Sequence, residues 1–257
     1  MADSDNKKAW KTAVTEIAPN TIRVRGEEIG SLIGSASFAS VAFLVIIGRR
    51  PSENEARLFE AILVSSVDHG VTPPSCVAAR TVASCGVSLS SAVAAGVLAI
   101  GRHHGGAVEA SMEMLAGGVR SAREAGRSTA DEAVRIVDES RKLGRRLSGF
   151  GHRLHTRDPR TTKLLALAVD LDLAGPHVAL AGEISKTLTG SLGREMPVNV
   201  DGAIAALLCE LGFPTALGNA AFIMSRVPGL IAHAHEEVTR ERPMRTIVPA
   251  DAVYDGP

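Results

Sequence analysis

The 257-residue chain has few aromatic residues and no excess charge of either sign. Aromatic residues make up 3% of it, and 28 basic residues balance 28 acidic ones. Proteins that bind single-stranded nucleic acids stack bases on aromatic side chains, and a basic surface attracts nucleic acid or anionic membranes. We therefore expect neither a nucleic-acid partner nor a membrane partner.

Cysteines and long apolar runs are also scarce. The three cysteines form no CxxC pair, and an odd number leaves one unpaired, which favours reduced thiols over a disulfide framework. The longest apolar run, residues 38–47, is too short to span a bilayer. The polar residues 1–8 are not followed by the apolar segment of a signal peptide. We therefore expect a cytoplasmic protein.

Helical periodicity dominates the rest of the chain. Ser52-x-x-Glu55 and Thr129-x-x-Glu132 have the form of capping boxes, and Pro73-Pro74 is typical of a helix start. One alternating stretch, residues 21–25, predicts a short hairpin near Gly26. The fold class is therefore all-α. The expected helices cover residues 52–68, 74–86, 90–101, 108–124, 129–144, 164–173, 178–188, 202–211 and 222–238.

The segment from Gly149 to Arg160 has the composition of a reaction site. Glycines on both sides of Phe150 let the backbone approach a ligand closely. His152, with an ordinary pKa of about 6.5, can take or release a proton at neutral pH. Arg153 and Arg160 offer planar donor groups that fit carboxylates or phosphates. The segment indicates an acid/base histidine among anion-binding arginines.

Polar residues at the predicted helix ends have a functional and a structural interpretation. His104, in His103-His104-Gly105-Gly106, is either a neutral imidazole held at a helix N-terminus or part of a solvated connector. Asp201 is either a catalytic acid or the N-cap of the next helix. Asp68-His69-Gly70 is either a ligand-binding turn or a helix end with a glycine stop. Taken singly, none of these patterns is specific.

The order of these motifs is more informative. The chain resembles the citrate synthase family in its motifs Asp68-His69, His103 to Ala107, Gly149 to Arg153, Asp158 to Arg160, and Asn199 to Gly202. Residues 24–29, 37–51 and 225–233 extend the resemblance towards both ends. It implies a single catalytic domain, residues 1–257, with a large and a small helical part closing over a cleft. The smaller, mobile part would cover roughly residues 107–200.

The short stretch between Pro51 and His69 narrows the resemblance. Full-length citrate synthases place a long helical stretch there, whereas this chain has one short predicted helix. In this short stretch, and in residues 199–204, the chain is similar to citryl-CoA lyases and to the citryl-CoA lyase module of ATP-citrate lyase. The implied function is cleavage of citryl-CoA to acetyl-CoA and oxaloacetate. The alternatives are a citrate or 2-methylcitrate synthase and a non-catalytic sensor of CoA thioesters or organic acids.

The resemblance also implies roles for individual residues. His152 would be the base on the tertiary hydroxyl, His104 the donor to the thioester oxygen, and Asp201 the group that moves a proton at the methylene carbon. His69, Arg160 and Arg226 would hold the oxaloacetate part. The family has a C-terminal arginine that crosses the dimer interface. It is absent here, and Arg242 or Arg245 would replace it.

CoA would lie along the glycine-containing segment. The residues implied for it are Arg145, Arg146, Leu147, Gly149, Phe150, Gly151 and Arg153. For Arg145 and Arg146 the alternative is a solvated cationic helix end. The resemblance implies no metal and no permanently bound cofactor, a homo-oligomer built on a dimer, and an ATP-dependent citrate–CoA ligase as a functional partner.

Overall fold

The computed structural model describes residues 10–151 and 158–257. Helices dominate these residues, as the sequence predicts, and a small three-stranded sheet is added to them near the N-terminus. The chain divides into two compact units, residues 1–60 and 61–257. The predicted smaller part, residues 107–200, stays a prediction.

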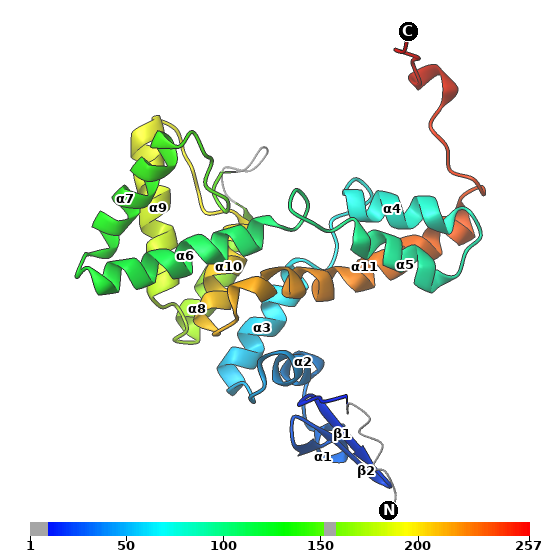
Figure 1. The fold of residues 1–257 in the computed structure, drawn as a ribbon, viewed down its shortest axis with the longest axis horizontal. Coiled ribbons are helices and arrows are strands. Elements are labelled where there is room, and N and C mark those ends of the chain that lie inside the picture. The colour runs from blue at the N-terminus through cyan, green and yellow to red at the C-terminus, as the bar shows by residue number, and fades with distance from the viewer. Residues whose placement is uncertain (1–9, 152–157) are drawn as a thin grey trace, which may run out of the picture. The chain divides into compact units, whose positions relative to one another are not determined.

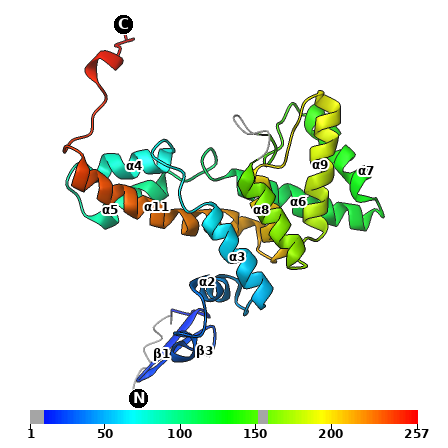
Figure 2. The same cartoon turned by 180° about the vertical axis from the view of Figure 1, so that it is seen from behind.

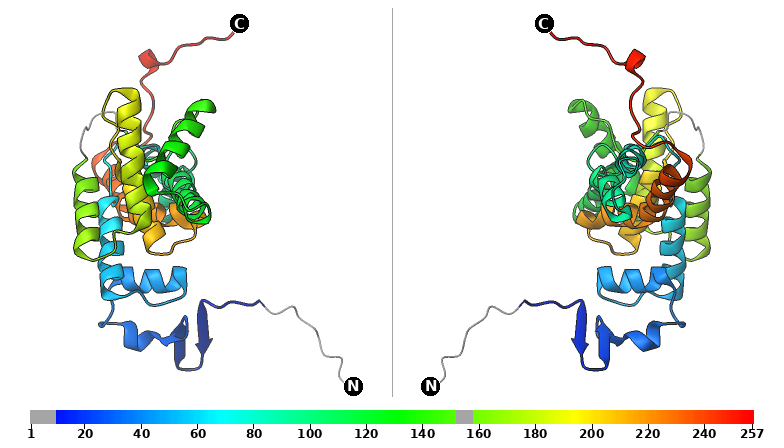
Figure 3. Two further views of the ribbon diagram at one scale, coloured as in Figure 1. Left: turned by 90° about the vertical axis from the view of Figure 1, so that its left-hand side faces the viewer. Right: turned by 90° about the vertical axis from the view of Figure 1, so that its right-hand side faces the viewer.

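The first unit begins with a small antiparallel sheet in the order β1-β2-β3. The strands are β1 (Thr15–Ala18), β2 (Thr21–Val24) and β3 (Glu27–Glu28), and Figure 3 shows β1 and β2 side by side. Arg25 and Gly26 join β2 to β3 with φ of +50° and +86°, the backbone of a tight two-residue hairpin turn. The hairpin expected near Gly26 is therefore present, and β1 is an addition to it.

Arg25 ties this hairpin to the helices that follow, α1 (Ile29–Leu32) and α2 (Phe38–Ile47). Its Nε and Nη2 donate to the carbonyl oxygen of Val45 at 3.0 and 2.8 Å. Because both donors converge on one oxygen in α2, the turn cannot move independently of that helix. Val24, Leu32 and Leu44 form the apolar core beneath it.

Helix α3 (Glu53–Ser65) begins at the predicted capping box. The Glu55 N–H donates to Ser52 Oγ at 3.2 Å, and the Ser52 N–H donates to Glu55 Oε2 at 2.7 Å. Both backbone donors at the helix start are thereby satisfied, as the pattern predicts. The helix ends at Ser65, before Asp68, so Asp68-His69-Gly70 is not its terminus.

The second unit contains two groups of helices. In one, α4 (Pro74–Ala83) and α5 (Leu89–Leu98) pack on each other and on the long α11 (Gly218–Arg240). The other group consists of α6 (Ala107–Glu124), α7 (Thr129–Lys142), α8 (Pro159–Asp170), α9 (Pro176–Leu192) and α10 (Val200–Glu210). Figures 1 and 2 show both groups, and α11 also contacts α6.

Helix α10 is the buried centre of the second group. Residues 202–208 are all buried, and α10 packs against α6, α8 and α9. A helix that is apolar on every side belongs in a protein interior. The start of α10 therefore places Asp201 on a rigid, enclosed element.

Within residues 10–151 and 158–257, no helix is both long enough and apolar enough to cross a membrane.

The N-terminal ends of α8 and α7 differ from the prediction, the first in its starting residue and the second in its capping residue. α8 begins at Pro159 rather than near Leu164, because Asp158 is its N-cap and accepts the Arg160 N–H at 2.9 Å. α7 is capped by Ser128 rather than Thr129, since Ser128 has extended backbone angles and its Oγ accepts the Asp131 N–H at 3.1 Å. The first difference places Arg160 in the first turn of a helix.

A buried ion cluster fixes the C-terminal end of α11. Arg80 of α4 donates through Nε to Glu237 Oε2 at 2.6 Å, and the Glu237 side chain is fully buried. Arg245, beyond α11, donates to both oxygens of the same carboxylate at 2.7 and 2.8 Å. The hydrogen bonds with Arg245, helped by the charges of both arginines, lower the pKa of Glu237. One carboxylate therefore holds three segments of the chain together.

We expect Glu237→Gln to lower the free energy of unfolding by up to about 3–5 kcal/mol, since it removes the fully buried counter-charge of Arg80 and leaves that arginine with the more exposed Glu236 and Glu241. Urea denaturation of wild type and variant measures this. Arg240→Ala is the control, because it breaks only the exposed Arg240–Glu236 pair and should cost at most about 0.5 kcal/mol. Equal losses of the free energy of unfolding in the two variants would contradict the structural role of Glu237.

The folded pKa of Glu237 lies below the unfolded one, so the stabilisation by Glu237 is full above about pH 4.3 and is lost as the pH falls through the folded value.

Candidate active site

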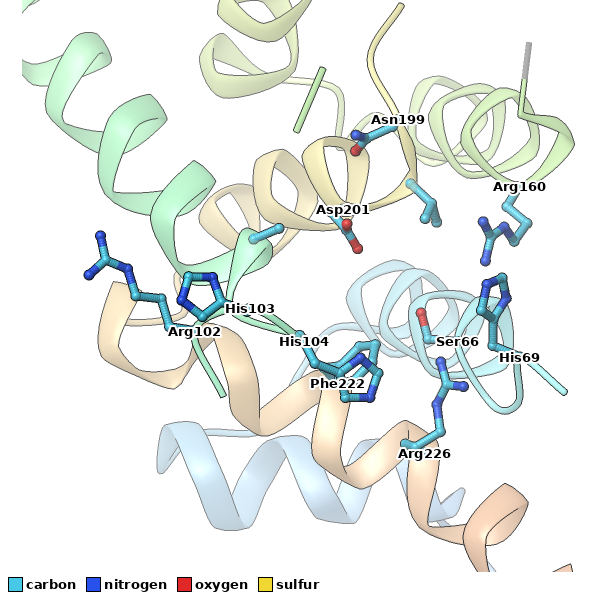
Figure 4. A pocket seen from close by; sticks show the side chains of 13 residues that line it. Ser66, His69, Arg102, His103, His104, Arg160, Asn199, Asp201, Phe222 and Arg226 are labelled. Atoms are coloured by element: carbon cyan, nitrogen blue, oxygen red, sulfur yellow. The ribbon is translucent and has the colours of Figure 1, made fainter. Parts of the chain in front are cut away.

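A cavity of about 290 Å³ in the second unit collects residues that are far apart in the sequence. Five of the predicted site residues line it: His69, His104, Arg160, Asp201 and Arg226. In Figure 4, His69, Arg160 and Arg226 lie on one side of Asp201, and Arg102 and His103 lie on the other. The further lining residues are Ser66, Arg102, His103, Gly105, Ala107, Asn199, Val200 and Phe222.

His104 stands in a tight turn before α6. Gly105 has φ +94°, and a Cβ there would lie 2.9 Å from the Ile100 side chain and 3.0 Å from the Phe222 ring. Only glycine satisfies both conditions. The imidazole packs edge-to-face on Phe222, with the ring centroids 5.8 Å apart. The histidine is therefore held by its surroundings and is not a solvated connector residue.

Ser75, fully buried at the start of α4, hydrogen-bonds to Nε2 of His104 at 2.8 Å. Burial is the main reason that the pKa of His104 is lowered, and the charges of Arg226 and His69 add to it. When the Ser75 hydroxyl donates to Nε2, the proton of the neutral ring is on Nδ1, which can then donate to a ligand oxygen.

Asp201 does not cap α10. The cap is Asn199, whose Oδ1 accepts the Gly202 N–H at 3.1 Å. Asp201 lies in the first turn, where the helix dipole favours a carboxylate, and it lines the cavity. The structural interpretation of Asp201 as an N-cap is therefore wrong.

Two arginines give the cavity its anion-binding character. The guanidinium of Arg160 is oriented by Asp158, with Nε–Oδ1 at 3.1 Å and Nη2–Oδ2 at 2.8 Å. Arg226 is only 5% exposed, and its guanidinium carbon lies 5.0 Å from the centre of the Phe222 ring. Within the part of the chain that the structure describes, the buried Nε of Arg226 has no hydrogen-bond partner. A buried unpaired donor is costly, so an anionic ligand would improve its environment.

His69 reaches the cavity from the turn between α3 and α4. Asp68 fixes this turn, because its Oδ2 accepts the Gly70 N–H at 2.8 Å and its Oδ1 lies 3.1 Å from His233 Nε2. The helix-end interpretation of Asp68-His69-Gly70 is wrong, because α3 ends at Ser65 and these residues form a separate turn. His69 is exposed towards the cavity from a turn anchored on α11.

A second cavity, of about 670 Å³, contains most of the residues predicted for CoA: Arg145, Arg146, Leu147, Phe150 and Gly151. Among the described residues, Arg141 of α7 and Arg194, beyond α9, bring the arginines that line it to four, against one acidic residue, Glu195. Gly149 is not among the lining residues and packs instead on the first turn of α10. The glycines at 149 and 151 both have positive φ, as the segment's composition predicts.

Of the predicted site residues, His152, Arg153 and Arg245 remain. His152 and Arg153 lie outside the described residues. Arg245 lines neither cavity in the single chain and is bound to Glu237. The roles given to these residues stay predictions.

Sequence reasoning missed several residues that shape the site. Phe222 is four positions before Arg226 on α11, so helical spacing was an available signal for their contact. Ser75 gave no signal, because its contact with His104 joins residues 29 positions apart. Arg102 and His103 stand next to the predicted His104 and line the same cavity.

Comparison with known proteins places this geometry in context. Residues 47–247 match the family model described as citrate synthase, C-terminal domain. The solved citryl-CoA lyase from Hydrogenobacter thermophilus is 42% identical, with a TM-score of 0.90 over 97% of this chain and 96% of that chain. The ATP citrate lyase from Methanothrix soehngenii, solved with citrate and coenzyme A, has a TM-score of 0.85 over 98% of this chain and 42% of that chain; at 21% identity this shows a shared fold.

Among curated sequences, the glyoxysomal citrate synthase of Cucurbita maxima is 28% identical over 91% of this chain and 50% of its own length. The chain therefore spans about half the length of the curated relatives that it matches. It is similar in extent to the Hydrogenobacter protein.

We expect the His104 ring to titrate below the ordinary histidine pKa of about 6.5, so that it is neutral at pH 7. An NMR titration of labelled histidines, with His104→Gln to assign the resonance, measures this midpoint. Arg226→Gln should raise the midpoint, since it removes a positive neighbour and leaves the burial. A wild-type midpoint at or above 6.5 would contradict the described environment.

Proposed function

Because the chain belongs to the citrate synthase family, we propose that it is a citryl-CoA lyase, an enzyme that cleaves citryl-CoA to acetyl-CoA and oxaloacetate. The observation that carries the proposal is the single cavity that holds His104 and Asp201 beside His69, Arg160 and Arg226. The 42% identity and the TM-score of 0.90 with the Hydrogenobacter citryl-CoA lyase support the lyase over the synthase, since the curated synthases that match are 28–36% identical.

The reaction follows from the groups in the cavity. A base removes the proton of the tertiary hydroxyl, the resulting C–O electrons form the ketone of oxaloacetate, and the bond to the methylene carbon breaks. The electron pair of that bond passes into the thioester as an enolate. His104 donates a hydrogen bond to the thioester oxygen, which stabilises the developing charge. Asp201, in its protonated form, gives a proton to the methylene carbon.

The base in these reaction steps is His152, a role that rests on the family motif. The proton it takes from the hydroxyl and the proton that Asp201 delivers to carbon balance the reaction. A neutral His104 fits this role, because the neutral imidazole still has an N–H to donate and brings no further positive charge beside Arg226.

The oxaloacetate part would occupy the side of the cavity with Arg160, Arg226 and His69. Guanidinium groups bind carboxylates through two parallel hydrogen bonds, and the unpaired Nε of Arg226 is one such donor. Among the described lining residues, Asp201 is the one acidic side chain, so the dicarboxylate enters a positive field.

The CoA part would occupy the arginine-lined cavity. Its phosphates carry several negative charges, and Arg145 and Arg146 stand in that cavity with Arg141 and Arg194. We further propose that the protein acts as a homo-oligomer built on a dimer and in the cytoplasm. An ATP-dependent citrate–CoA ligase would supply its substrate.

Incubation of the purified protein with citryl-CoA should release oxaloacetate, detected by coupling to NADH oxidation with malate dehydrogenase. Asp201→Asn should lower the rate by at least about 100-fold, since one acid/base group contributes about 10²–10⁴-fold. A parallel reaction with acetyl-CoA and oxaloacetate tests the opposite direction. Citrate and free CoA from that mixture alone would identify a synthase. Binding without turnover in both would identify a sensor.

Calorimetry of CoA binding tests the second cavity. We expect Arg145→Met or Arg146→Met to weaken CoA binding about tenfold or more, because a hydrogen bond to a charged group contributes about 1.5–3 kcal/mol. Arg120→Met, at an exposed site outside both cavities, is the control and should leave the affinity unchanged. If both cavity variants bind CoA like wild type, Arg145 and Arg146 form only a solvated cationic helix end.

A further inference from the structure

The two cavities share a wall made of two short, paired segments. Residues 149–151 run antiparallel to residues 197–199. Between them the Gly151 N–H donates to the Pro197 oxygen at 2.8 Å, and the Asn199 N–H donates to the Gly149 oxygen at 2.9 Å. Gly151 lines the arginine-lined cavity, and Asn199 lines the cavity of Asp201. Any shift between these segments therefore moves one cavity relative to the other.

The side-chain amide of Asn199 joins both sides of this wall. Its Oδ1 accepts the Gly202 N–H at 3.1 Å, which caps α10, and its Nδ2 donates to the Gly151 oxygen at 3.0 Å. The orientation of the amide follows from these partners, since an N–H requires the oxygen and a carbonyl requires the nitrogen. With its backbone N–H also bonded, Asn199 is held on both sides.

Backbone lies directly against backbone at this point. A Cβ on Gly202 would overlap the carbonyl oxygen of Gly149, and a Cβ on Gly149 would lie 2.8 Å from the Cα of Gly202. No side chain separates the two segments, so neither can relax without displacing the other. Asp201 is the residue immediately before Gly202 and takes its position from the same turn.

We propose that Asn199 is a positioning residue that sets the arginine-lined cavity at the correct distance from Asp201. The inference rests on the proposed function, in which one substrate molecule has its CoA part in the arginine-lined cavity and its reacting methylene carbon beside Asp201. The cap bond fixes Asp201, and the bond to Gly151 fixes the wall against which CoA lies. A misplacement of about 1 Å between reacting groups can cost about 100-fold in rate.

Asn199→Ser separates the two bonds of the amide. Serine is a good N-cap, so α10 should keep its start, whereas the short hydroxyl cannot also donate to the Gly151 oxygen. We expect the kcat for citryl-CoA to fall about 30–100-fold, while the affinities for CoA alone and for oxaloacetate alone stay within about threefold. The melting temperature should change no more than in Asn219→Ser, a control that loses an amide hydrogen bond to Glu109 outside both cavities.

Asn199→Asp is the second variant, because a carboxylate caps α10 and has no proton to donate to Gly151. It should show the same loss of kcat, and it replaces the serine variant as the test if that variant folds poorly. Wild-type turnover in a folded Asn199→Ser or Asn199→Asp overturns the proposal. A fall in melting temperature with loss of both single-ligand affinities in each variant also overturns it, since that result describes a purely structural residue.

Hydrogen exchange tests the same coupling without turnover. CoA binding to wild type should slow exchange in peptides covering the first turn of α10, and Asn199→Ser should lose that protection while it still binds CoA. Wild-type protein that cleaves no citryl-CoA but shows this coupling would refute the proposed function and leave the positioning role standing. Wild-type protein without the coupling would refute the positioning role.

Discussion

Direct backbone contact between residues 149–151 and the first turn of α10 is the constraint on which the site depends. It places a segment that lines the arginine-rich cavity against the helix that carries Asp201. α10 is buried along residues 202–208, so the contact is built on the most enclosed element of the second unit. A loop that meets such a helix through glycine alone has little freedom to drift. The precision of the site therefore comes from packing as much as from the polar residues.

The electrostatics of the first cavity separate the roles of its similar groups. His69, His104, Arg160 and Arg226 are all basic side chains, yet their surroundings differ. Arg160 has a carboxylate partner in Asp158, Arg226 has an aromatic ring and an unpaired nitrogen, and His104 is buried against a serine hydroxyl. Burial and positive neighbours keep His104 neutral, and the arginines remain anion-binding groups. The surroundings of each side chain within one cavity thus make His104 a neutral hydrogen-bond donor and Arg160 and Arg226 charged partners for an anion.

Local patterns in the sequence predict local structure well. Ser52 and Glu55 form the expected reciprocal cap, and the periodic segments are helices. The order of the motifs identifies the family and names the five residues that the first cavity collects. Such motifs carry this information because they belong to one site, although each alone has a structural alternative.

What the sequence could not supply depends on contacts between distant segments. Asn199 and Asp201 are both good caps at the start of α10, and only the bond to the Gly202 N–H shows which one serves. The contact between Ser75 and His104 needs α4 and the turn before α6 to meet. The pairing of Arg245 with Glu237 likewise depends on where the chain returns after α11. Spacing along the chain cannot decide any of these.

The unpaired nitrogen of Arg226 has a consequence for the protein without its substrate. Among the described residues, the cavity gathers buried and partly buried cations around one acidic side chain, so it is a region of self-repulsion in the unliganded state. Filling it with a dianion relieves that repulsion and adds binding free energy to folding free energy. Resistance to unfolding and to proteolysis would then rise with the concentration of the organic acid, so the abundance of the protein would follow the supply of its own ligand.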